Sequence, residues 1–405
     1  MRRSLYAMVL VLALIVPLLA ACGGGGGATT PAAPTAAAAA PTAAPAPTAA
    51  PEATAAPAPT AAPEATAAPE ATAAAAPTAA STGGASGKAL KVGLVTDVGK
   101  IDDKSFNQSS WEGVQQAQKD LGADIKFIET TDPKDYQKNI EQFADAGYDV
   151  IVTVGFALGE ATYQEAKKYP NIKFIGVDQF QAKDDTHPDI PLANYAGLVF
   201  EEDKAGYLAG ALAALMSKSG TIGAVLGTDV VPPVWRYGEG YRAGAKAVKP
   251  DVNVQIVYHS DVGFDKTFSD PEWGKTTALS MIDKGADVIF GAGGKTGNGA
   301  LLGCADKNVY AIGVDTDQYL TVPEAQKVML SSAMKLLTPG VFNLIKAVQD
   351  GSFKGGNNVG QTGLAPYHDL DSQVPADVKA KIQELDKGLQ DGSVKTNVPP
   401  AKPAS

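Results

Sequence analysis

A glycine-rich segment is the first place in this sequence where phosphate chemistry could occur. Gly294, Lys295 and Thr296 reproduce the end of the P-loop, in which glycines, a lysine and a hydroxyl hold nucleotide phosphates. The P-loop also requires an earlier glycine, and the corresponding position 289 is an isoleucine. The dinucleotide-binding pattern fails too, because its third glycine would fall at Thr296. The segment therefore predicts no nucleotide phosphate site.

Side chains that usually perform catalysis or bind metals do not gather in the sequence. The histidines are His187, His259 and His368. None has a second His or a Cys at metal-ligand spacing, and His-Glu-x-x-His and Gly-x-Ser-x-Gly motifs are absent from the sequence. The pairs Asp102-Asp103 and Asp184-Asp185 could do acid–base work, although adjacent acids in loops are usually solvated. We expect a binding protein rather than an enzyme, with no metal and no cofactor.

The elements that must position these side chains alternate between strands and helices. Buried, β-branched runs predict strands at Lys91–Thr96, Val150–Thr153 and Lys173–Val177. Amphipathic stretches predict helices at Ser105–Leu121, Pro133–Ala146 and Ala157–Tyr169. This alternation predicts an α/β fold in which parallel sheets are flanked by helices. The region from Lys88 onward, about 300 residues, is long enough for two domains.

The chain also repeats itself at long range, which predicts two similar lobes. Gly147–Gly155 is echoed by Gly285–Gly293, and the sequence Ile-Gly-Val-Asp occurs at both Ile175–Asp178 and Ile312–Asp315. Ligands of open parallel sheets collect at the carboxyl ends of the strands. If the two lobes face each other, those ends line one cleft between domains, a common place for a small-molecule site.

The N-terminus has the features of a lipoprotein signal. Arg2 and Arg3 precede an apolar run from Leu5 to Ala21, and Leu19-Ala20-Ala21-Cys22 resembles the bacterial lipobox. We therefore expect a signal peptide over 1–21 and lipidation of Cys22. This anchor would hold the protein at the cell membrane, on its extracytoplasmic face.

Low-complexity sequence follows the predicted anchor. Residues 22–87 consist almost entirely of Ala, Pro, Thr and Gly, and have little to bury, so we expect a disordered stalk. With Cys22 used by the anchor, Cys304 has no disulfide partner and is expected to be a small buried residue. The net charge of −10 argues against a nucleic-acid partner, and we expect a monomer.

Several motifs, in order along the folded region, together resemble one known family. They are Asp97–Gln108 with Trp111–Gly113, Gly176–Gln179, Ala205–Gly210, Tyr237–Tyr241, Gly293–Gly299, Gly313–Gln318 and Ser332–Lys335. This combination resembles the basic membrane protein family, also called PnrA-like substrate-binding lipoproteins. The resemblance implies a two-lobed type I periplasmic-binding-protein fold and delivery of a small molecule to an ABC permease. Well-understood members of the family bind purine nucleosides between two aromatic rings.

The resemblance also suggests which residues surround the base. Phe106 matches one of the two rings, and Tyr237 matches the other, where the family more often has Phe. Trp235 could replace or supplement Tyr237. Gly293 or Gly294 matches a glycine that allows close approach of the backbone to the ligand.

The polar contacts implied by the resemblance involve three carboxylates, an amide and a lysine. Asp97, Asn107 and Asp178 match contacts near the base or the cleft rim, and Asp315 and Lys335 match the pair that engages ribose hydroxyls. A carboxylate can accept hydrogen bonds from both hydroxyls, so ligands without them would be rejected. Asp97 and Asp315 could instead cap the helices that follow their strands.

The domain boundaries follow from the expected two-lobed fold. We expect residues 88–196 and 318–358 in the first lobe, 197–317 and 359–390 in the second, and a flexible tail over 391–405. Hinges are then expected near Asn194–Gly197, Asp315–Tyr319 and Asn357–Gly360. Two alternatives remain open for function: a binder of another flat heteroaromatic, such as riboflavin or a free nucleobase, and a receptor subunit that senses a ligand.

Overall fold

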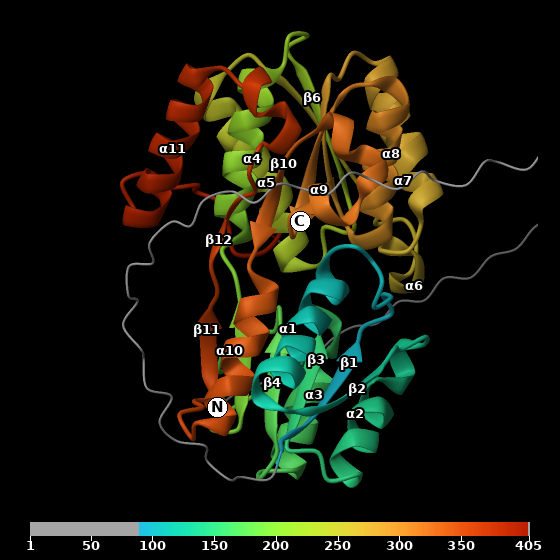
Figure 1. The fold of residues 1–405 in the computed structure, drawn as a ribbon, viewed down its shortest axis with the longest axis vertical. Coiled ribbons are helices and arrows are strands. Elements are labelled where there is room, and N and C mark those ends of the chain that lie inside the picture. The colour runs from blue at the N-terminus through green and yellow to red at the C-terminus, as the bar shows by residue number, and fades with distance from the viewer. Residues whose placement is uncertain (1–88, 404–405) are drawn as a thin grey trace, which may run out of the picture. The chain divides into compact units, whose positions relative to one another are not determined.

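The computed structural model describes residues 89–403 (Figure 1). The predicted signal peptide, the lipidation site Cys22 and the stalk therefore lie outside the described residues. Within residues 89–403, no helix is both long and apolar enough to cross a membrane.

The first lobe is built on a six-stranded sheet of order β11-β5-β4-β3-β1-β2. Its strands are β1 (Lys91–Thr96), β2 (Asp124–Ile128), β3 (Val150–Val154), β4 (Lys173–Val177), β5 (Tyr195–Val199) and β11 (Gly356–Val359). All pairings in this sheet are parallel. The accompanying helices are α1 (Phe106–Leu121), α2 (Tyr136–Asp145), α3 (Gly159–Lys168) and α10 (Leu337–Gln349).

The second lobe repeats this arrangement in a sheet of order β12-β10-β9-β8-β6-β7. Its strands are β6 (Thr221–Leu226), β7 (Asn253–Tyr258), β8 (Val288–Ala292), β9 (Tyr310–Asp315), β10 (Met329–Lys335) and β12 (Thr362–Leu364). Its helices are α4 (Glu202–Met216), α5 (Pro232–Val248), α6 (Phe264–Thr267), α7 (Pro271–Asp283), α8 (Gly294–Lys307), α9 (Gln318–Thr321) and α11 (Ala376–Asp391). Only the edge strand β12 departs from the predicted parallel sheets, because it pairs antiparallel with β10.

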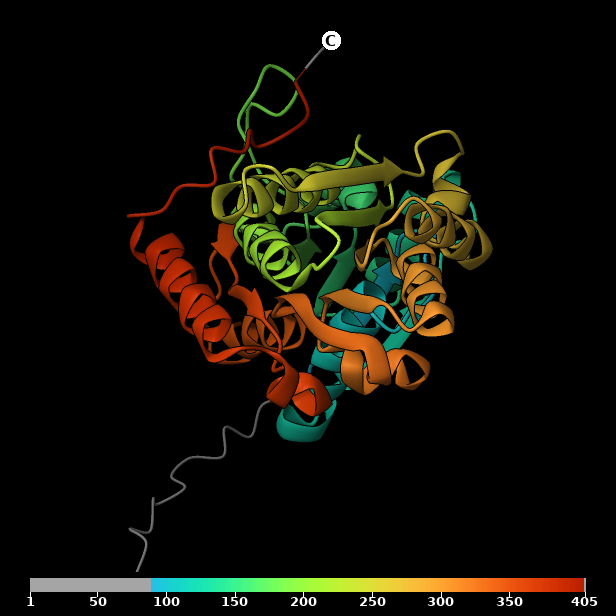
Figure 2. The same cartoon turned by 90° about the horizontal axis from the view of Figure 1, so that it is seen from above.

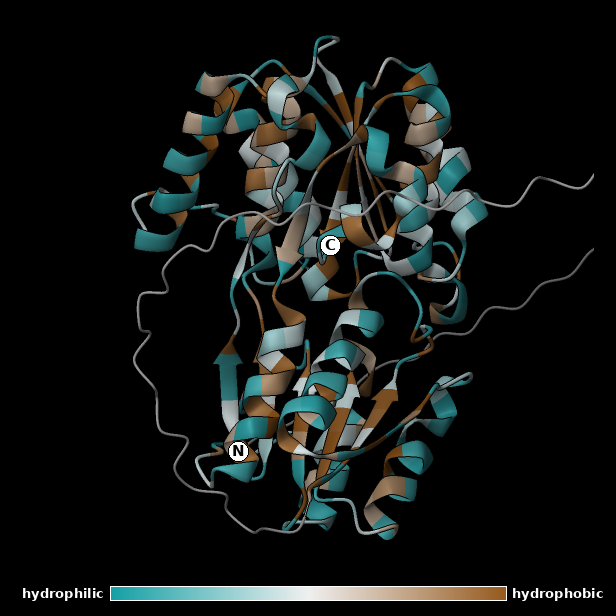
Figure 3. Cartoon of the chain, viewed as in Figure 1, coloured by the Kyte–Doolittle hydropathy of each residue, from teal (hydrophilic) through white to brown (hydrophobic). Residues whose placement is uncertain are grey.

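The central strands of both sheets are buried on their two faces, as their continuous apolar sequences predict. Every residue of β3 and of β8 is buried. Figure 3 shows hydrophobic strands inside each lobe and hydrophilic residues on the outer faces of the helices. The long-range repeat corresponds to this topology, since β3 and β8, like β4 and β9, occupy equivalent positions in the two sheets.

The chain passes between the lobes three times, and the second crossing differs from the one that the sequence suggested. It crosses between β5 and α4, between β10 and α10, and between β11 and β12, which belong to different sheets. The expected first lobe included 318–358, yet β10 pairs with β9 and β12 of the second sheet. The second crossing therefore follows Lys335 rather than Asp315–Tyr319. The apolar sequence of β10 predicts a strand but cannot indicate which of two similar sheets the strand joins.

The C-terminal segment is also different from the expected flexible tail over 391–405. Helix α11 continues to Asp391, and the backbone N–H of Val394 donates to the Gly388 carbonyl at 2.9 Å. Further on, Arg236 Nη1 donates to the Pro400 carbonyl at 2.9 Å, and the Thr396 hydroxyl donates to Asp203. Figure 2 shows α11 and the segment after it along the second lobe. Arg236 belongs to α5 and Asp203 to α4, and both helices are distant in sequence from the C-terminal segment.

The motifs Ala205–Gly210 and Tyr237–Tyr241 contain glycines at which the helices α4 and α5 pack against each other. Helices α4 and α5 pack so closely that a Cβ on Gly210 would lie 1.8 Å from the Tyr241 carbonyl oxygen. Reciprocally, a Cβ on Gly244 would lie 1.9 Å from the Tyr207 carbonyl oxygen. Nearly every residue of α4 is buried, so neither helix can move outward without opening the core.

We predict that Gly210→Ala destabilises the protein, although alanine favours an isolated helix over glycine. The new methyl group must push α4 and α5 apart, and overpacking of this kind costs about 1–3 kcal/mol. Urea denaturation measures this cost as a lower free energy of unfolding. The control is Gly363→Ala in β12, where a Cβ meets no atom within 4 Å. Equal stabilities of the two variants would contradict the close packing.

Candidate functional site

A cavity lies between the lobes, at the carboxyl ends of the central strands of both sheets. Its lining includes Asp97 after β1, Asp178 after β4, and Asp315 and Lys335 at the ends of β9 and β10. The empty space, including its open mouth, is about 780 Å³. The location is the one expected for parallel sheets that face each other.

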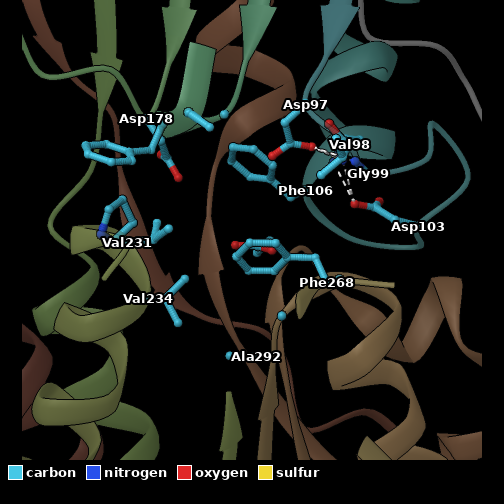
Figure 4. A pocket seen from close by; sticks show the side chains of 18 of the residues that line it. Asp97, Val98, Gly99, Asp103, Phe106, Asp178, Val231, Val234, Phe268 and Ala292 are labelled. Carbon is cyan, nitrogen blue, oxygen red and sulfur yellow. Dashed lines mark hydrogen bonds between the residues drawn. The ribbon is translucent and has the colours of Figure 1, made fainter. Parts of the chain in front are cut away.

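Two aromatic rings approach the cavity from opposite lobes. Phe106 is the first residue of α1, and Phe268 follows α6 directly. Figure 4 shows the two rings facing each other, with Asp97 and Asp178 on one side and Val231, Val234 and Ala292 on the other. Phe156 and Phe264 also line the cavity and are partly exposed to solvent. A flat ring bound between Phe106 and Phe268 would contact both lobes at once.

The expected second ring, Tyr237, has a different environment. Tyr237 lines the cavity, but its side chain is buried in the core, where its hydroxyl donates to the Ala333 carbonyl at 3.1 Å. Its ring packs edge to face on Phe290, with centroids 5.9 Å apart. Trp235 does not line the cavity, because residues two apart on α5 project from different sides of the helix.

Charge is concentrated around the buried ammonium group of Lys335. Lys335 Nζ lies 2.5 Å from Asp178 Oδ2, 3.5 Å from Glu202 Oε1 and 3.8 Å from Asp315 Oδ1. Arg236 adds a second cation, and its Nε donates to Glu202 Oε2 at 2.9 Å. The Lys335 ammonium also lies 4.6 Å from the centroid of the Phe106 ring. Three buried carboxylates therefore share two cations beside one of the facing rings.

The pKa values of this cluster reflect burial and mutual attraction. Burial raises the pKa of Asp178 and Asp315, and the nearby Lys335 ammonium opposes this rise. Burial alone would lower the pKa of Lys335, but the carboxylates of Asp178, Glu202 and Asp315 hold it above its usual value. Lys335 is therefore a fixed positive charge in the wall of the cavity.

The two aspartates of the Ile-Gly-Val-Asp repeat have the same unusual backbone. Asp178 has a φ of 60° and Asp315 a φ of 65°. Non-glycine residues adopt this left-handed conformation rarely, and such strain is concentrated at functional sites. Asp178 directly follows β4 and Asp315 ends β9, both of them central strands. The internal repeat therefore places one carboxylate from each lobe in the cavity. Asp315 does not cap a helix but accepts a hydrogen bond from Ser105 Oγ at 2.6 Å.

A third group of polar residues surrounds the start of α1. Asp97 Oδ1 accepts from the Gly99 N–H at 2.9 Å, so Asp97 shapes its own loop rather than capping a helix. The helix cap is Asp103, whose carboxylate accepts from the backbone N–H groups of Ser105 and Asn107 at 2.9 Å and Gln108 at 3.1 Å. Asp103 is therefore buried and not a solvated member of an acidic pair.

Three polar atoms at the cavity have unused hydrogen-bonding capacity, and one of them is the Tyr136 hydroxyl. Asn107 Oδ1 and Asp178 Oδ1 are buried and have no hydrogen-bond partner among residues 89–403. Buried polar atoms of folded proteins are nearly always hydrogen-bonded. Both side chains line the cavity, so a ligand with N–H or O–H groups could provide the missing donors.

Gly293 and Gly294 bring the N-terminus of α8 to the cavity. Gly293 has a φ of 155°, and a Cβ there would lie 2.7 Å from the Gly227 nitrogen. A Cβ on Gly294, which has a φ of 55°, would lie 2.9 Å from the Phe268 carbonyl oxygen. Gly294 therefore allows the segment that carries Phe268 to pack against the helix, whereas Gly293 allows close approach of the backbone that follows β6. The positive end of the α8 dipole then lies at the cavity.

The structure thus brings together every predicted contact residue except Trp235. Sequence reasoning missed Phe268, Tyr136 and the capping role of Asp103. Phe268 lies four residues after Phe264 in an otherwise polar segment and belongs to none of the recognised motifs, so no motif marks it. A search of residues 89–403 finds no group of three or more His, Cys, Asp or Glu side chains that could hold a metal.

Comparison with known proteins gives consistent similarities. The family model described as "ABC transporter substrate-binding protein PnrA-like" matches residues 90–364. The chain is 32% identical to the CD4+ T-cell-stimulating antigen of Listeria monocytogenes, over 78% of this chain and 90% of that protein. It is 34% identical to the ABC transporter nucleoside-binding protein BmpA of Lactococcus lactis, over 68% of this chain and 80% of that protein.

Solved structures share the fold. The structure of ABC transporter system solute-binding proteins from Aeropyrum pernix has a TM-score of 0.67 at 26% identity, covering 76% of this chain and 94% of that chain. A periplasmic solute-binding protein from Actinobacillus succinogenes, solved with D-allose, has a TM-score of 0.54 at 15% identity, covering 70% and 99%. At that identity the second similarity concerns the fold alone.

The shifted pKa of Asp97 predicts that this residue affects the stability of the protein differently at different pH values. Burial raises this pKa to about 6, against the opposing hydrogen bond from Gly99. The folded chain then holds this proton more tightly than the unfolded chain, so the stability contribution falls as pH rises from about 4 to about 6. We expect Asp97→Asn, without ligand, to raise the free energy of unfolding by about 1–2 kcal/mol at pH 7.5 and by much less at pH 4.

Urea denaturation at both pH values measures this difference. Asp283→Asn is the control, because the Asp283 side chain is 71% exposed on the outer end of α7. A stability gain for Asp97→Asn that is the same at both pH values would contradict the shifted pKa.

Proposed function

Because the chain belongs to the PnrA-like family of ABC transporter substrate-binding proteins, we propose that it binds purine nucleosides in the cavity between its lobes. The observation that carries this proposal is the pair of rings, Phe106 and Phe268, that face each other from opposite lobes. A purine between them would gain stacking on both faces, and base–aromatic stacking is worth about 1–3 kcal/mol. The Lactococcus lactis relative, named as a nucleoside-binding protein, supports the same ligand class.

The polar groups of the cavity suit a ribose beside the base. Asp315 and Lys335 lie at the ends of neighbouring strands, and a carboxylate with an adjacent ammonium can bind two vicinal hydroxyls. The unpaired oxygens Asn107 Oδ1 and Asp178 Oδ1 can accept from the amino or ring N–H groups of a purine or from further hydroxyls. In this arrangement Ser105 gives up its hydrogen bond to Asp315 when the sugar enters.

The charge of the cavity favours a neutral ligand. Asp97, Asp103, Asp178 and Asp315 line it, whereas Lys335 is the only Lys or Arg among the described lining residues. A phosphate group would bring additional negative charge beside these carboxylates at low dielectric, which is strongly unfavourable. We therefore propose that the protein binds nucleosides rather than nucleotides and releases its ligand unchanged to an ABC permease.

The first test of this proposal measures how much the Phe268 ring contributes to ligand binding. Calorimetric titration with inosine, adenosine, guanosine, adenine and riboflavin should show tight binding of the nucleosides. Phe268→Ala should weaken binding roughly 5- to 150-fold, which corresponds to about 1–3 kcal/mol of stacking. Trp235→Ala is the matched control and should bind as the wild type does, because Trp235 lies outside the cavity. Binding of riboflavin or adenine without any nucleoside would contradict the proposal.

A second test concerns the ribose. Wild-type protein should bind inosine more tightly than 2′-deoxyinosine, because the deoxy ligand leaves a buried acceptor unpaired at a cost of about 1–3 kcal/mol. Asp315→Ala should bind inosine weakly and lose most of this preference. If the variant kept the preference of the wild type, another residue would have to recognise the sugar.

We further propose that Cys22 anchors the protein to the extracytoplasmic face of the cell membrane. Its lipobox motif and the stalk sequence support this proposal. Metabolic labelling with a clickable fatty acid should label the wild type and not Cys22→Ser. Cys304→Ser, which changes a buried core thiol, should keep the label. Equal labelling of the wild type and Cys22→Ser would place the lipid elsewhere.

A further inference from the structure

The loop between β1 and α1, residues Gly99–Ser105, reaches from the first lobe into the second. Asn298 Nδ2 on α8 donates to the Asp103 carbonyl at 2.8 Å. The Lys104 carbonyl accepts from Gln318 Nε2 at 3.1 Å and from Thr321 Oγ1 at 2.8 Å, both on α9.

The side chain of Gln318 is held in the orientation that lets it donate a hydrogen bond to this loop. This side chain is fully buried, and its Oε1 accepts from the Val314 N–H at 2.9 Å, which fixes the orientation of the amide. Its Nε2 donates to Asn298 Oδ1 at 2.8 Å as well as to the Lys104 carbonyl. If the lobes separated, one buried N–H of Gln318 would lose its acceptor, which is unfavourable unless water replaces it.

The second lobe contributes to the backbone conformation of the loop. Lys104 has a φ of 62°, in the left-handed region that a lysine rarely occupies. Such a conformation persists only where surrounding contacts over-determine it. The contacts here are the two hydrogen bonds to the Lys104 carbonyl and the ion pair of Asp102 with Lys295, whose atoms are 2.8 Å apart.

The loop is also coupled to the ligand cavity. The Asp103 carboxylate caps α1 through the N–H groups of Ser105, Asn107 and Gln108, so the loop sets the position of the first turn of α1. That turn carries Phe106 and Asn107, which line the cavity. None of Asn298, Gln318 and Thr321 lines the cavity itself.

We propose that loop Gly99–Ser105 is a latch, and that Asn298, Gln318 and Thr321 are positioning residues that keep the lobes closed even without ligand. When a ligand is bound, the same contacts slow its release. This second statement rests on the proposed function, whereas the closed state without ligand does not.

Trypsin cleavage at Lys104 of the full-length protein tests the latch in the absence of any nucleoside. A protease needs an extended, released loop, so the cleavage rate follows the open population. Wild-type protein should be cut after Lys104 much more slowly than after Lys183, which is exposed and lies outside any helix or strand. Mass spectrometry follows both cuts in one sample, so cleavage after Lys183 serves as an internal reference.

The double variant Asn298→Ala/Thr321→Val should be cut after Lys104 roughly 5- to 30-fold faster than the wild type, as expected for two lost hydrogen bonds of ordinary strength. Thr276→Val is a matched control, because its hydroxyl bonds only within α7, to the Glu272 and Trp273 carbonyls.

Two results would overturn the latch: cleavage of wild-type protein at Lys104 as fast as at Lys183, or equal rates for the wild type and the double variant. Stopped-flow release of inosine adds a second readout, with a faster dissociation rate in the double variant and an unchanged rate in Thr276→Val. Slow cleavage of the wild type combined with no inosine binding would leave the latch standing and reject the nucleoside. A double variant with weakened protection at both lysines would be misfolded, and Thr321→Val alone, a surface change, then gives the comparison.

Discussion

The buried ammonium of Lys335 is the interaction on which the rest of the structure depends. Lys335 ends β10, and the chain enters the first lobe immediately after it. Its closest partner, Asp178, belongs to the first lobe, whereas Asp315 belongs to the second. Removing one member of a buried ion pair leaves an uncompensated charge, at a cost of about 3–5 kcal/mol. The lobes therefore meet at a defined point, and this point is also the wall of the cavity.

The residues near this point serve architecture and recognition together. Glu202 begins α4 directly after the first crossing between lobes, and it contacts both Lys335 and Arg236. Tyr237 contributes its ring to the cavity but uses its hydroxyl in the core. The glycines of α4 and α5 allow these helices to pack closely, which places Tyr237 beside β10. A ligand in the cavity therefore contacts side chains whose positions are set by the main packing of the second lobe.

Internal repetition explains how the two lobes form one site. The repeated Ile-Gly-Val-Asp segments end equivalent strands, and both aspartates adopt positive φ. The repeat is not symmetrical in chemistry, however. The first lobe contributes Phe106, Asn107 and the capping Asp103, whereas the second contributes Phe268, Lys335 and the N-terminus of α8. Because each lobe holds one ring and part of the polar set, neither lobe alone forms the site.

The sequence by itself determined the alternation of strands and helices, the two related lobes and the strand ends from which polar side chains reach the cavity. These features depend on local patterns, namely buried apolar strands, the repeat of Ile175–Asp178 at Ile312–Asp315, and motifs that place polar residues at strand ends. Only the tertiary structure decided which sheet receives β10, which aromatic residue opposes Phe106, and where the C-terminal segment lies. Each of these depends on contacts between residues distant in the chain, such as β10 with β12, Phe268 across from α1, and Pro400 with Arg236. A strand sequence specifies its hydrophobic faces but not its neighbour, and a lone Phe in a polar loop has no periodicity that reveals its direction.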